Sequence, residues 1–191
     1  MKLSKVKRVC VDASEIIVKR ADTGIDIRTW IGTNTALYPV RGMDIKAELA
    51  IKIWEIEPKK LRNMEIIQDT DEDEALTLIE RSDLEQLSFL GDVYAAAYDE
   101  ETPGLINIAT INNCTLLLDK KTMDGWVIRK DKLAPIEGDR LLFIPVEENR
   151  NLIAVYGGGY LEAALYAIRW EKDDFMKDVM RKISEIYKKS E

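Results

Sequence analysis

Apolar residues in this chain fall mainly into short runs separated by turn residues. Residues 9–18 are rich in β-branched side chains and predict a strand, and residues 19–29 contain an Asp-Thr-Gly turn signal typical of a hairpin. Residues 36–40 predict a third short strand. Residues 45–56 fit neither a clean helical nor a clean alternating pattern, so we expect a turn of helix followed by a strand over residues 50–56. The first part of the chain is therefore expected to form a small antiparallel sheet.

The same order of short apolar runs and polar turns returns in the second half of the chain. The strands predicted there cover residues 93–98, 108–118, 126–129, 133–136, 141–146 and 152–156. The turns predicted between them cover residues 100–104, 120–125 and 147–151. Each half is thus expected to form a curved, β-rich unit.

A short motif occurs twice, at an offset of 96 residues: Trp30, Pro39 and Gly42 correspond to Trp126, Pro135 and Gly138. Upstream, residues 15–18 align with residues 115–118 if the second loop is four residues shorter. This repetition predicts a tandem duplication of one β-rich unit.

Helical patterns are fewer than strand patterns. Residues 71–89 are helical in pattern, with a break near Arg81 and Ser82, and Gly91 is a suitable stop. Residues 173–189 repeat apolar positions at helical spacing and predict a carboxy-terminal amphipathic helix. The expected class is α+β, in four parts: a first β-rich unit (1–62), an acidic helical connection (63–92), a second β-rich unit (93–170) and the terminal helix (171–191).

The composition is that of an ordinary globular protein, with 46% hydrophobic and 33% charged residues. No apolar run approaches the length of a membrane span, and the first residues lack the apolar core of a signal peptide. We therefore expect a cytoplasmic protein of the host cell. In that compartment Cys10 and Cys114, each within an apolar run, are expected to be reduced and buried.

The sequence contains no histidine. This removes the commonest general base and the commonest transition-metal ligand, and so excludes His-dependent triads and His-containing zinc sites. Two cysteines far apart in sequence do not make a thiolate zinc site. We expect a protein without catalytic residues or cofactor; a carboxylate enzyme using a divalent metal is a less favoured alternative.

Negative charge is concentrated in the middle of the chain. The net charge is −7, and residues 63–101 hold thirteen acidic residues and one basic residue, Arg81. An acidic surface repels nucleic acid and attracts basic protein surfaces, so we expect a protein partner with a basic surface rather than direct nucleic-acid binding. The candidate partner-binding residues are Asp69, Asp71, Glu72, Asp73 and Glu74.

The same acidic run has one metal-binding interpretation. Asp69, Asp71, Asp73 and Glu80 occupy the first, third, fifth and twelfth positions of a calcium loop. The sixth position, where the loop needs glycine, is Glu74. A solvated acidic loop and a docking surface for a basic partner are the alternatives.

Three further features have a structural and a functional interpretation. The Gly157–Gly159 cluster is expected to be a hairpin turn rather than a phosphate cradle. Trp30 and Trp126 are expected to fill the cores of the two units, with exposed interface anchors as the alternative. The amino-terminal cations Lys2, Lys5, Lys7 and Arg8 are expected to be solvated residues of a frayed end rather than a contact to a nucleic-acid backbone.

The opening MKLSKVKRVC, followed by a predicted hairpin and WIGTNTALYPVRGM, resembles small proteins encoded by phages and mobile elements of Gram-positive bacteria. The resemblance covers mainly residues 1–43 and extends to inhibitors of type II CRISPR nucleases, the anti-CRISPR proteins. It implies a protein that works by binding, and it carries over no individual contact residue. The acidic residues here are concentrated in one segment, unlike those of a simple nucleic-acid mimic.

The function that these observations favour is inhibition of a host nucleic-acid-handling enzyme, such as a type II CRISPR nuclease, by acidic-surface docking. The alternative is a structural or accessory interaction module of a mobile element. Whether the protein forms a homodimer through its terminal helix stays open.

Overall fold

The computed structural model describes residues 1–22, 27–40, 45–69, 104–138, 140–146, 151–158 and 160–170, and the single residues 181 and 185. The described helices are α1 (Leu3–Ala13), α2 (Ala47–Trp54), α3 (Pro58–Leu61) and α5 (Lys130–Leu133). The strands of the first part are β1 (Glu15–Asp22), β2 (Ile27–Thr33), β3 (Ala36–Val40) and β4 (Glu65–Asp69). The later strands are β5 (Ile106–Ile111), β6 (Cys114–Leu118), β7 (Gly125–Arg129), β8 (Leu141–Pro145), β9 (Leu152–Gly157), β10 (Tyr160–Tyr166) and β11 (Ile168–Trp170). The α+β class is confirmed.

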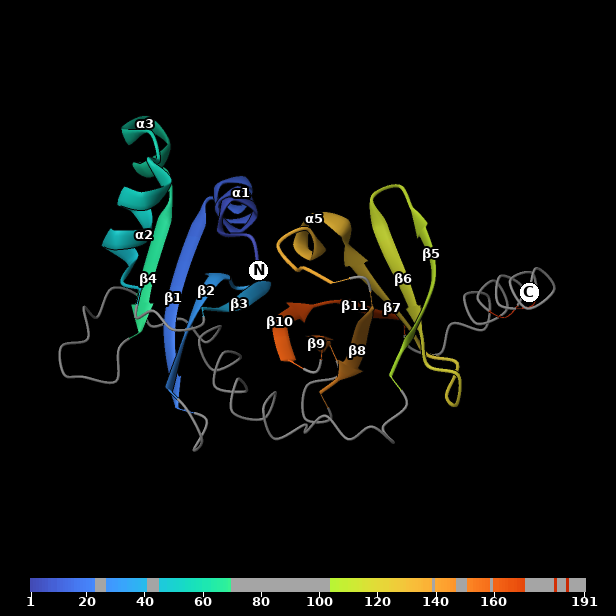
Figure 1. Cartoon of the computed structure of the whole chain (residues 1–191). Helices are drawn as coiled ribbons and strands as arrows, with labels where there is room; N and C mark the ends of the chain where they lie inside the picture. The colour runs from blue at the N-terminus through green and yellow to red at the C-terminus, as the bar shows by residue number, and fades with distance from the viewer. Residues whose placement is uncertain are drawn as a thin grey trace.

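The strands form two sheets (Figure 1). One has seven strands in the order β4-β1-β2-β3-β10-β9-β8, and the other has four in the order β11-β7-β6-β5. All neighbours are antiparallel except β1 and β4, which run parallel because α2 and α3 form the crossover between β3 and β4. Pairing of β3 with β10 places strands from both ends of the described chain in one sheet. The domain boundaries expected at residues 62, 92 and 170 stay predictions.

The two sheets are joined closely. Ala167 alone separates β10, in the seven-stranded sheet, from β11, in the four-stranded sheet; it is buried, and its N–H donates to the Asn151 carbonyl at 2.8 Å. On the other side, Leu105 and Phe143 form a β-bridge between the start of β5 and β8. These two connections hold the sheets side by side.

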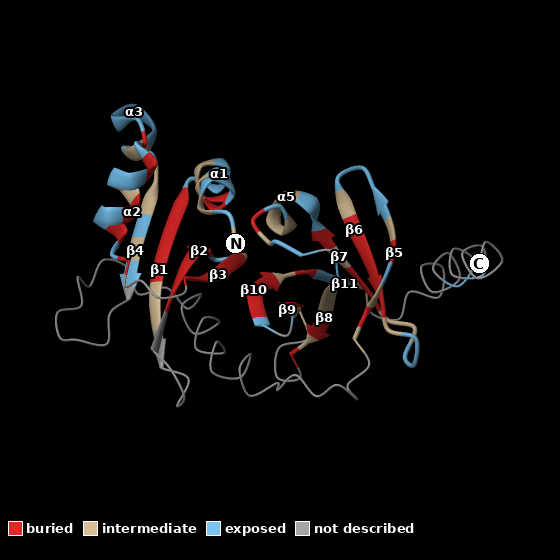
Figure 2. Ribbon diagram, viewed as in Figure 1, coloured by how far each residue is buried: buried red, intermediate tan, exposed pale blue. Residues whose placement is uncertain are grey.

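The main core lies between the sheets and the helices, where buried residues follow the inner strand faces (Figure 2). A second cluster lies on the opposite face of the seven-stranded sheet. Trp30 and Trp126 are both buried, which confirms the expectation that they are core residues. They belong to different clusters, since Trp126 is in the main core and Trp30 is in the second one.

The predicted strand over residues 9–18 is wrong in its first half. The chain is helical up to Ala13, because Val6, Val9 and Cys10 recur at helical spacing and bury one side of α1 against the sheet. Ser14 ends the helix in the left-handed conformation (φ 56°), and β1 begins at Glu15. Packing against the sheet outweighs the strand preference of the β-branched residues.

The predicted strand over residues 50–56 is also wrong, because Ala47–Trp54 is helix α2. Ala47, Ala50 and Trp54 face the core at helical spacing, while Leu49 and Ile53 are exposed. Apolar side chains on two sides of one helix leave no clean period, which explains the mistaken prediction.

Two details of the second half also differ from expectation. Residues 108–118 are two strands, because Asn112 and Asn113 both have positive φ (46° and 66°) and form the tight turn between β5 and β6. Residues 133–136 are not a strand: Leu133 is the last residue of α5, and residues 134–136 form a turn and loop that contain the buried Pro135. The turn at residues 120–125 and the strands at 126–129, 141–146 and 152–156 are confirmed to within a residue or so.

Several predicted elements lie outside the described residues. They are the strand at 93–98, the helical segment at 71–89, the polar turn at 147–150 and most of the amphipathic helix at 173–189. These stay predictions.

Candidate binding face

Helix α1 places the amino-terminal cations on an ordered surface. Val6, Val9 and Cys10 are buried against the sheet, while Lys5 and Arg8 point outward, with 75% of the Arg8 side chain exposed. The expectation of a frayed end is therefore wrong for these residues, since the helix spans Leu3–Ala13. Packing of the apolar side of α1 fixes the position of its cationic side.

Two hydrogen bonds, one from the middle of α1 and one from the residue before it, join the helix to neighbouring elements. The Lys7 ammonium donates a hydrogen bond to the carbonyl of Trp54 at the end of α2. The backbone N–H of Lys2 donates to the Pro135 carbonyl at 2.8 Å, after α5. Helix α1 is thereby held between α2 on one side and α5 on the other.

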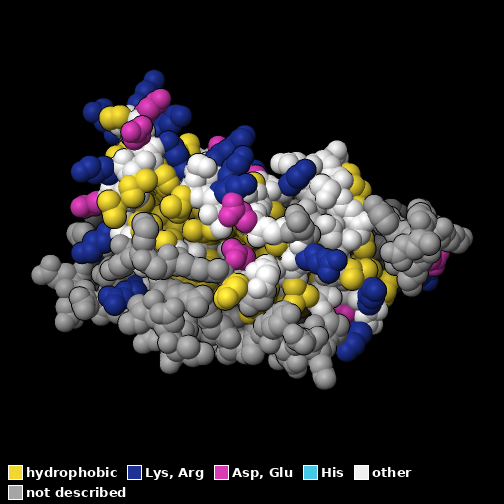
Figure 3. Space-filling view, in the orientation of Figure 1, with side chains coloured by type: hydrophobic (Ala, Val, Ile, Leu, Met, Phe, Trp, Pro, Cys, Tyr) yellow, Lys and Arg dark blue, Asp and Glu magenta, His cyan; other side chains and the backbone are white. Residues whose placement is uncertain are grey.

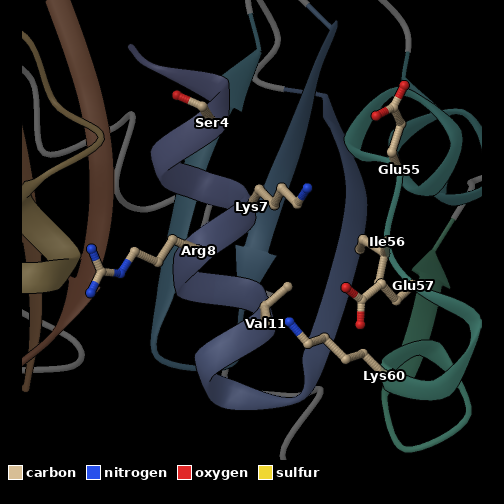
Figure 4. Close-up of a pocket in the computed structure, with 8 residues that line it drawn as sticks. All are labelled: Ser4, Lys7, Arg8, Val11, Glu55, Ile56, Glu57 and Lys60. Carbon is tan, nitrogen blue, oxygen red and sulfur yellow. The ribbon is translucent and has the colours of Figure 1, made fainter.

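A first groove separates α1 from the α2–α3 connection and has a volume of about 250 Å³. Its lining residues are Ser4, Lys7, Arg8, Val11, Glu55, Ile56, Glu57 and Lys60. Figure 4 shows Lys7 and Val11 directed toward the α2–α3 side, with Lys60 and Glu57 opposite, whereas Arg8 points to the other side of α1. The groove carries both signs of charge.

A second groove, of about 280 Å³, lies between α1 and the elements around α5. It is lined by Lys5, Arg8, Val9, Asp12, Asn113, Lys130, Asp131 and Ala134. Its far wall is fixed, since the Lys130 N–H donates to the Asn113 carbonyl at 2.8 Å and joins α5 to the β5–β6 turn. Arg8 is the residue that borders both grooves.

The carboxylates of the second groove have cationic partners. Arg129 donates to both carboxylate oxygens of Asp131, and the Lys132 N–H donates to Asp131 Oδ1 at 2.9 Å. Hydrogen bonding to Asp131 raises the pKa of the Arg129 guanidinium. Asp12 lies 3.7 Å from Arg8 in an exposed pair one helical turn apart. The remaining groove cations are Lys5 and Lys130.

Hydrogen bonds from Tyr38 and Lys132 hold helix α5 against the seven-stranded sheet. The Tyr38 hydroxyl, on β3, donates to the Lys132 carbonyl at 2.7 Å. Burial raises the pKa of Tyr38, so the hydroxyl stays protonated and available as a donor. The Lys132 ammonium reaches the Tyr166 carbonyl at 3.4 Å, and burial lowers its pKa. Lys132 therefore supports α5 rather than the open surface.

We define the helical face as the outer surface of α1, α3 and α5 with the two grooves between them. Its exposed cations include Lys5, Arg8, Lys59, Lys60, Arg62 and Lys130. Figure 3 shows dark blue side chains along this upper rim of the molecule, over α3, α1 and toward α5. The helical face is the cationic surface of the described structure.

The cysteine beneath α1 is shielded. Cys10 is buried, and its thiol donates to the Gly32 carbonyl at 3.4 Å. Burial, with the nearby charge of Glu15 as a smaller cause, raises the pKa of Cys10 to about 12. Both Cys10 and Cys114 are free thiols, as expected, although Cys10 lies in a helix and Cys114 is half-buried. Cys10 is a packing residue in this position.

Of the acidic candidate residues, only Asp69 lies within the described part of the chain. Asp69 is the last residue of β4. Asp71, Glu72, Asp73, Glu74 and Glu80 lie outside the described residues, so both the docking and the calcium hypotheses stay predictions. Within the described ranges, no group of three or more Cys, Asp or Glu side chains is arranged to hold a metal ion.

The glycine cluster is a turn between two strands, as expected. β9 ends at Gly157 and β10 begins at Tyr160, with Gly158 at a φ of +59°. A phosphate cradle of the expected kind would lead into a helix, whereas this turn leads into a strand.

Comparisons with protein-family models, with curated proteins and with solved structures found no match to this chain. The resemblance to anti-CRISPR proteins therefore stays a prediction. No helix in the described part of the chain is long and apolar enough to span a membrane.

Sequence reasoning missed the helical face because it placed the amino-terminal cations on a loose end. The signal was present: Val6, Val9 and Cys10 have the spacing of one helical side, and Lys5, Arg8 and Asp12 have the spacing of another. The contribution of Lys130 and Asn113 depends on tertiary structure, since they are more than 100 residues from α1 in sequence.

Proposed function

We propose that this protein works by binding, without catalysis, and that its partner is a host nucleic-acid-handling enzyme such as a type II CRISPR nuclease, which it inhibits. The observation that carries the proposal is the segregation of charge. Exposed Lys and Arg side chains of α1, α3 and α5 lie together on the helical face, whose first groove also holds Glu55 and Glu57, while β4 ends at Asp69, the first residue in sequence of the acidic run 69–74 (Figure 1).

The direction of β4 supports two separate contact surfaces. β4 runs away from α3, so Asp69 lies at the end of the strand that is remote from that helix (Figure 1). A nuclease loaded with nucleic acid presents basic protein surface and phosphates together. A protein with an acidic segment and a separate cationic face is complementary to both.

The test is a pull-down of the purified protein with the nuclease, with and without guide RNA, alongside a DNA-cleavage assay. We expect binding that weakens steeply as salt rises, and loss of cleavage. Neutralising Asp71, Asp73 and Glu74 with their amides is expected to weaken binding about tenfold, or about 1.4 kcal/mol.

The matched control neutralises three exposed acids that lie outside the acidic segment and line neither groove, Glu48→Gln, Glu137→Gln and Glu185→Gln. It removes the same charge and is expected to bind and inhibit like the parent. Equal weakening in both triple variants would contradict docking by the acidic segment. Undiminished cleavage with no binding at low salt would reject this nuclease as the partner.

A second candidate, an interaction module of a mobile element, is favoured by one observation. Leu49 and Ile53 are 42% and 51% exposed on one side of α2, and Ile66, on the edge strand β4, is 42% exposed. Exposed apolar residues beside an unpaired strand edge are typical of association sites. This candidate predicts association that barely changes with salt.

The tandem duplication and the host-cytoplasm location belong to the same proposal. Support for the duplication comes from the β1–β2 and β6–β7 hairpins, each of which carries the repeated Trp on its second strand. After that Trp the halves differ, since one continues into β3 and the other into α5. A duplicated hairpin with diverged continuations accounts for both facts.

A further inference from the structure

The cations of the helical face come from elements that are distant in sequence. Lys5 and Arg8 are on α1, Lys60 is on α3 and Lys130 is on α5. The ion pairs found in the described part of the chain do not include Lys5, Lys60 or Lys130. The fold therefore gathers ammonium groups whose charge is available to an external anion.

The carboxylates of the second groove have cationic partners, whereas the first groove also holds the exposed Glu55 and Glu57. Asp131 is held by Arg129, and Asp12 is paired with Arg8. Across the second groove, Lys5 on one wall thus faces Lys130 on the other, beside the exposed amide side chain of Asn113. Lys and Arg with nearby amide and hydroxyl groups form the usual set of contacts to phosphate oxygens.

The apolar residues of the surface identify the class of partner. The exposed large apolar residues of the described chain are Leu49, Ile53, Ile66, Ile111, Tyr160 and Ile168, and none lines either groove. A protein partner usually requires an apolar or aromatic centre at the interface. Nucleic-acid interfaces are much more cationic than protein interfaces, which agrees with the Lys and Arg side chains of this face.

The residues that line the grooves also favour one form of nucleic acid, a duplex, over a single strand. Single strands are held by exposed aromatic side chains on which bases stack. Among the described residues, those that line the two grooves include no aromatic side chain. Contacts limited to phosphates suit a duplex, whose bases are already stacked.

We infer that the helical face binds the phosphate backbone of a nucleic-acid duplex, without sequence preference, with Lys5 and Lys130 contacting phosphates from the two walls of the second groove. This binding requires no other protein, so it goes beyond the proposed function. It also departs from the expectation, drawn from the acidic middle of the chain, that a basic protein partner is favoured over direct nucleic-acid binding. The net charge of −7 is a sum over the whole chain, whereas the exposed side chains of this face include six Lys and Arg residues.

The experiment titrates the full chain alone into a short fluorescein-labelled DNA duplex and follows fluorescence anisotropy between about 50 and 200 mM salt. We expect saturable binding. The logarithm of the association constant should fall linearly as the logarithm of the salt concentration rises. The double variant Lys5→Gln, Lys130→Gln is expected to bind about tenfold or more weakly and to lower the salt slope by about two.

The control double variant is Lys120→Gln, Lys121→Gln in the β6–β7 turn. These exposed lysines lie away from the helical face (Figure 1), and their loss changes the net charge by the same amount. It is expected to retain the affinity and salt slope of the parent. All four lysines are exposed, so their substitution is expected to change stability little. An unchanged thermal unfolding temperature would verify that each variant is folded.

Four results would overturn the inference. One is the absence of duplex binding by the parent at about 50 mM salt. Another is equal weakening in the two double variants, which would place the effect in net charge. The third is tighter binding to an acidic polypeptide than to the duplex, which would identify an acidic protein as the partner. Tighter binding to a single strand would reject the duplex preference.

Discussion

Among single residues, the two cysteines show how burial sets reactivity. Cys10 lies under α1 with a pKa of about 12, whereas Cys114 is half-buried at the start of β6. The thiolate is the reactive form, so at pH 8 we expect the native protein to react with Ellman's reagent at Cys114 and the denatured protein at both thiols. The number of thiols that react is measured from the absorbance of the released thionitrobenzoate as a function of time.

The control for this prediction is Cys114→Ser, which is expected to show no reaction until it is unfolded. Fast reaction of Cys10 in that folded variant would show that α1 opens readily.

The raised pKa of Cys10 also makes the stability of the folded protein depend on pH. The folded state keeps a proton that the unfolded thiol loses above its ordinary pKa of 9.0, so Cys10 lowers the free energy of unfolding as the pH rises from there toward about 12.

At the scale of elements, the placement of α1 depends on one side chain more than its neighbours. Lys7 donates to the Trp54 carbonyl at the end of α2, while Lys5 is exposed. We expect Lys7→Met to lower the free energy of unfolding by about 1–2 kcal/mol, since a hydrogen bond from a charged donor is lost and a carbonyl is left unsatisfied. Urea denaturation measures this change.

Lys5→Met on the same helix is the matched variant, and it is expected to change stability by less than about 0.5 kcal/mol. Equal losses in the two variants would mean that the Lys7 hydrogen bond does not hold α1 to α2.

The elements also show what the sequence could predict. The strands over residues 126–129, 141–146 and 152–156 were predictable because short apolar runs lie between clear turns. α1 could be predicted from the helical spacing of Val6, Val9 and Cys10, although its β-branched residues favour a strand. α2 could not, because apolar residues on two sides of the helix obscure the helical period. Asn112 and Asn113 are turn-favouring residues within the predicted strand over residues 108–118, so the break between β5 and β6 was also predictable. The cationic face could not be assembled from sequence, because its walls meet only through tertiary contacts.

At the scale of the whole molecule, the described strands do not separate into independent halves. β3 pairs with β10, and the main core contains residues from both parts of the chain. We therefore expect thermal unfolding in one cooperative transition, with calorimetric and van 't Hoff enthalpies that agree. Differential scanning calorimetry measures both. Two resolved transitions, or a folded fragment of residues 1–62, would contradict this prediction.

The single-residue link between β10 and β11 has a consequence for kinetics. Ala167 is buried and hydrogen-bonded, so we expect the link to resist bending and the second groove to keep its width before a partner arrives. A preformed site loses little conformational entropy on binding. Association is then limited by encounter and orientation instead of a rearrangement, so its rate should rise in proportion to partner concentration without reaching a plateau.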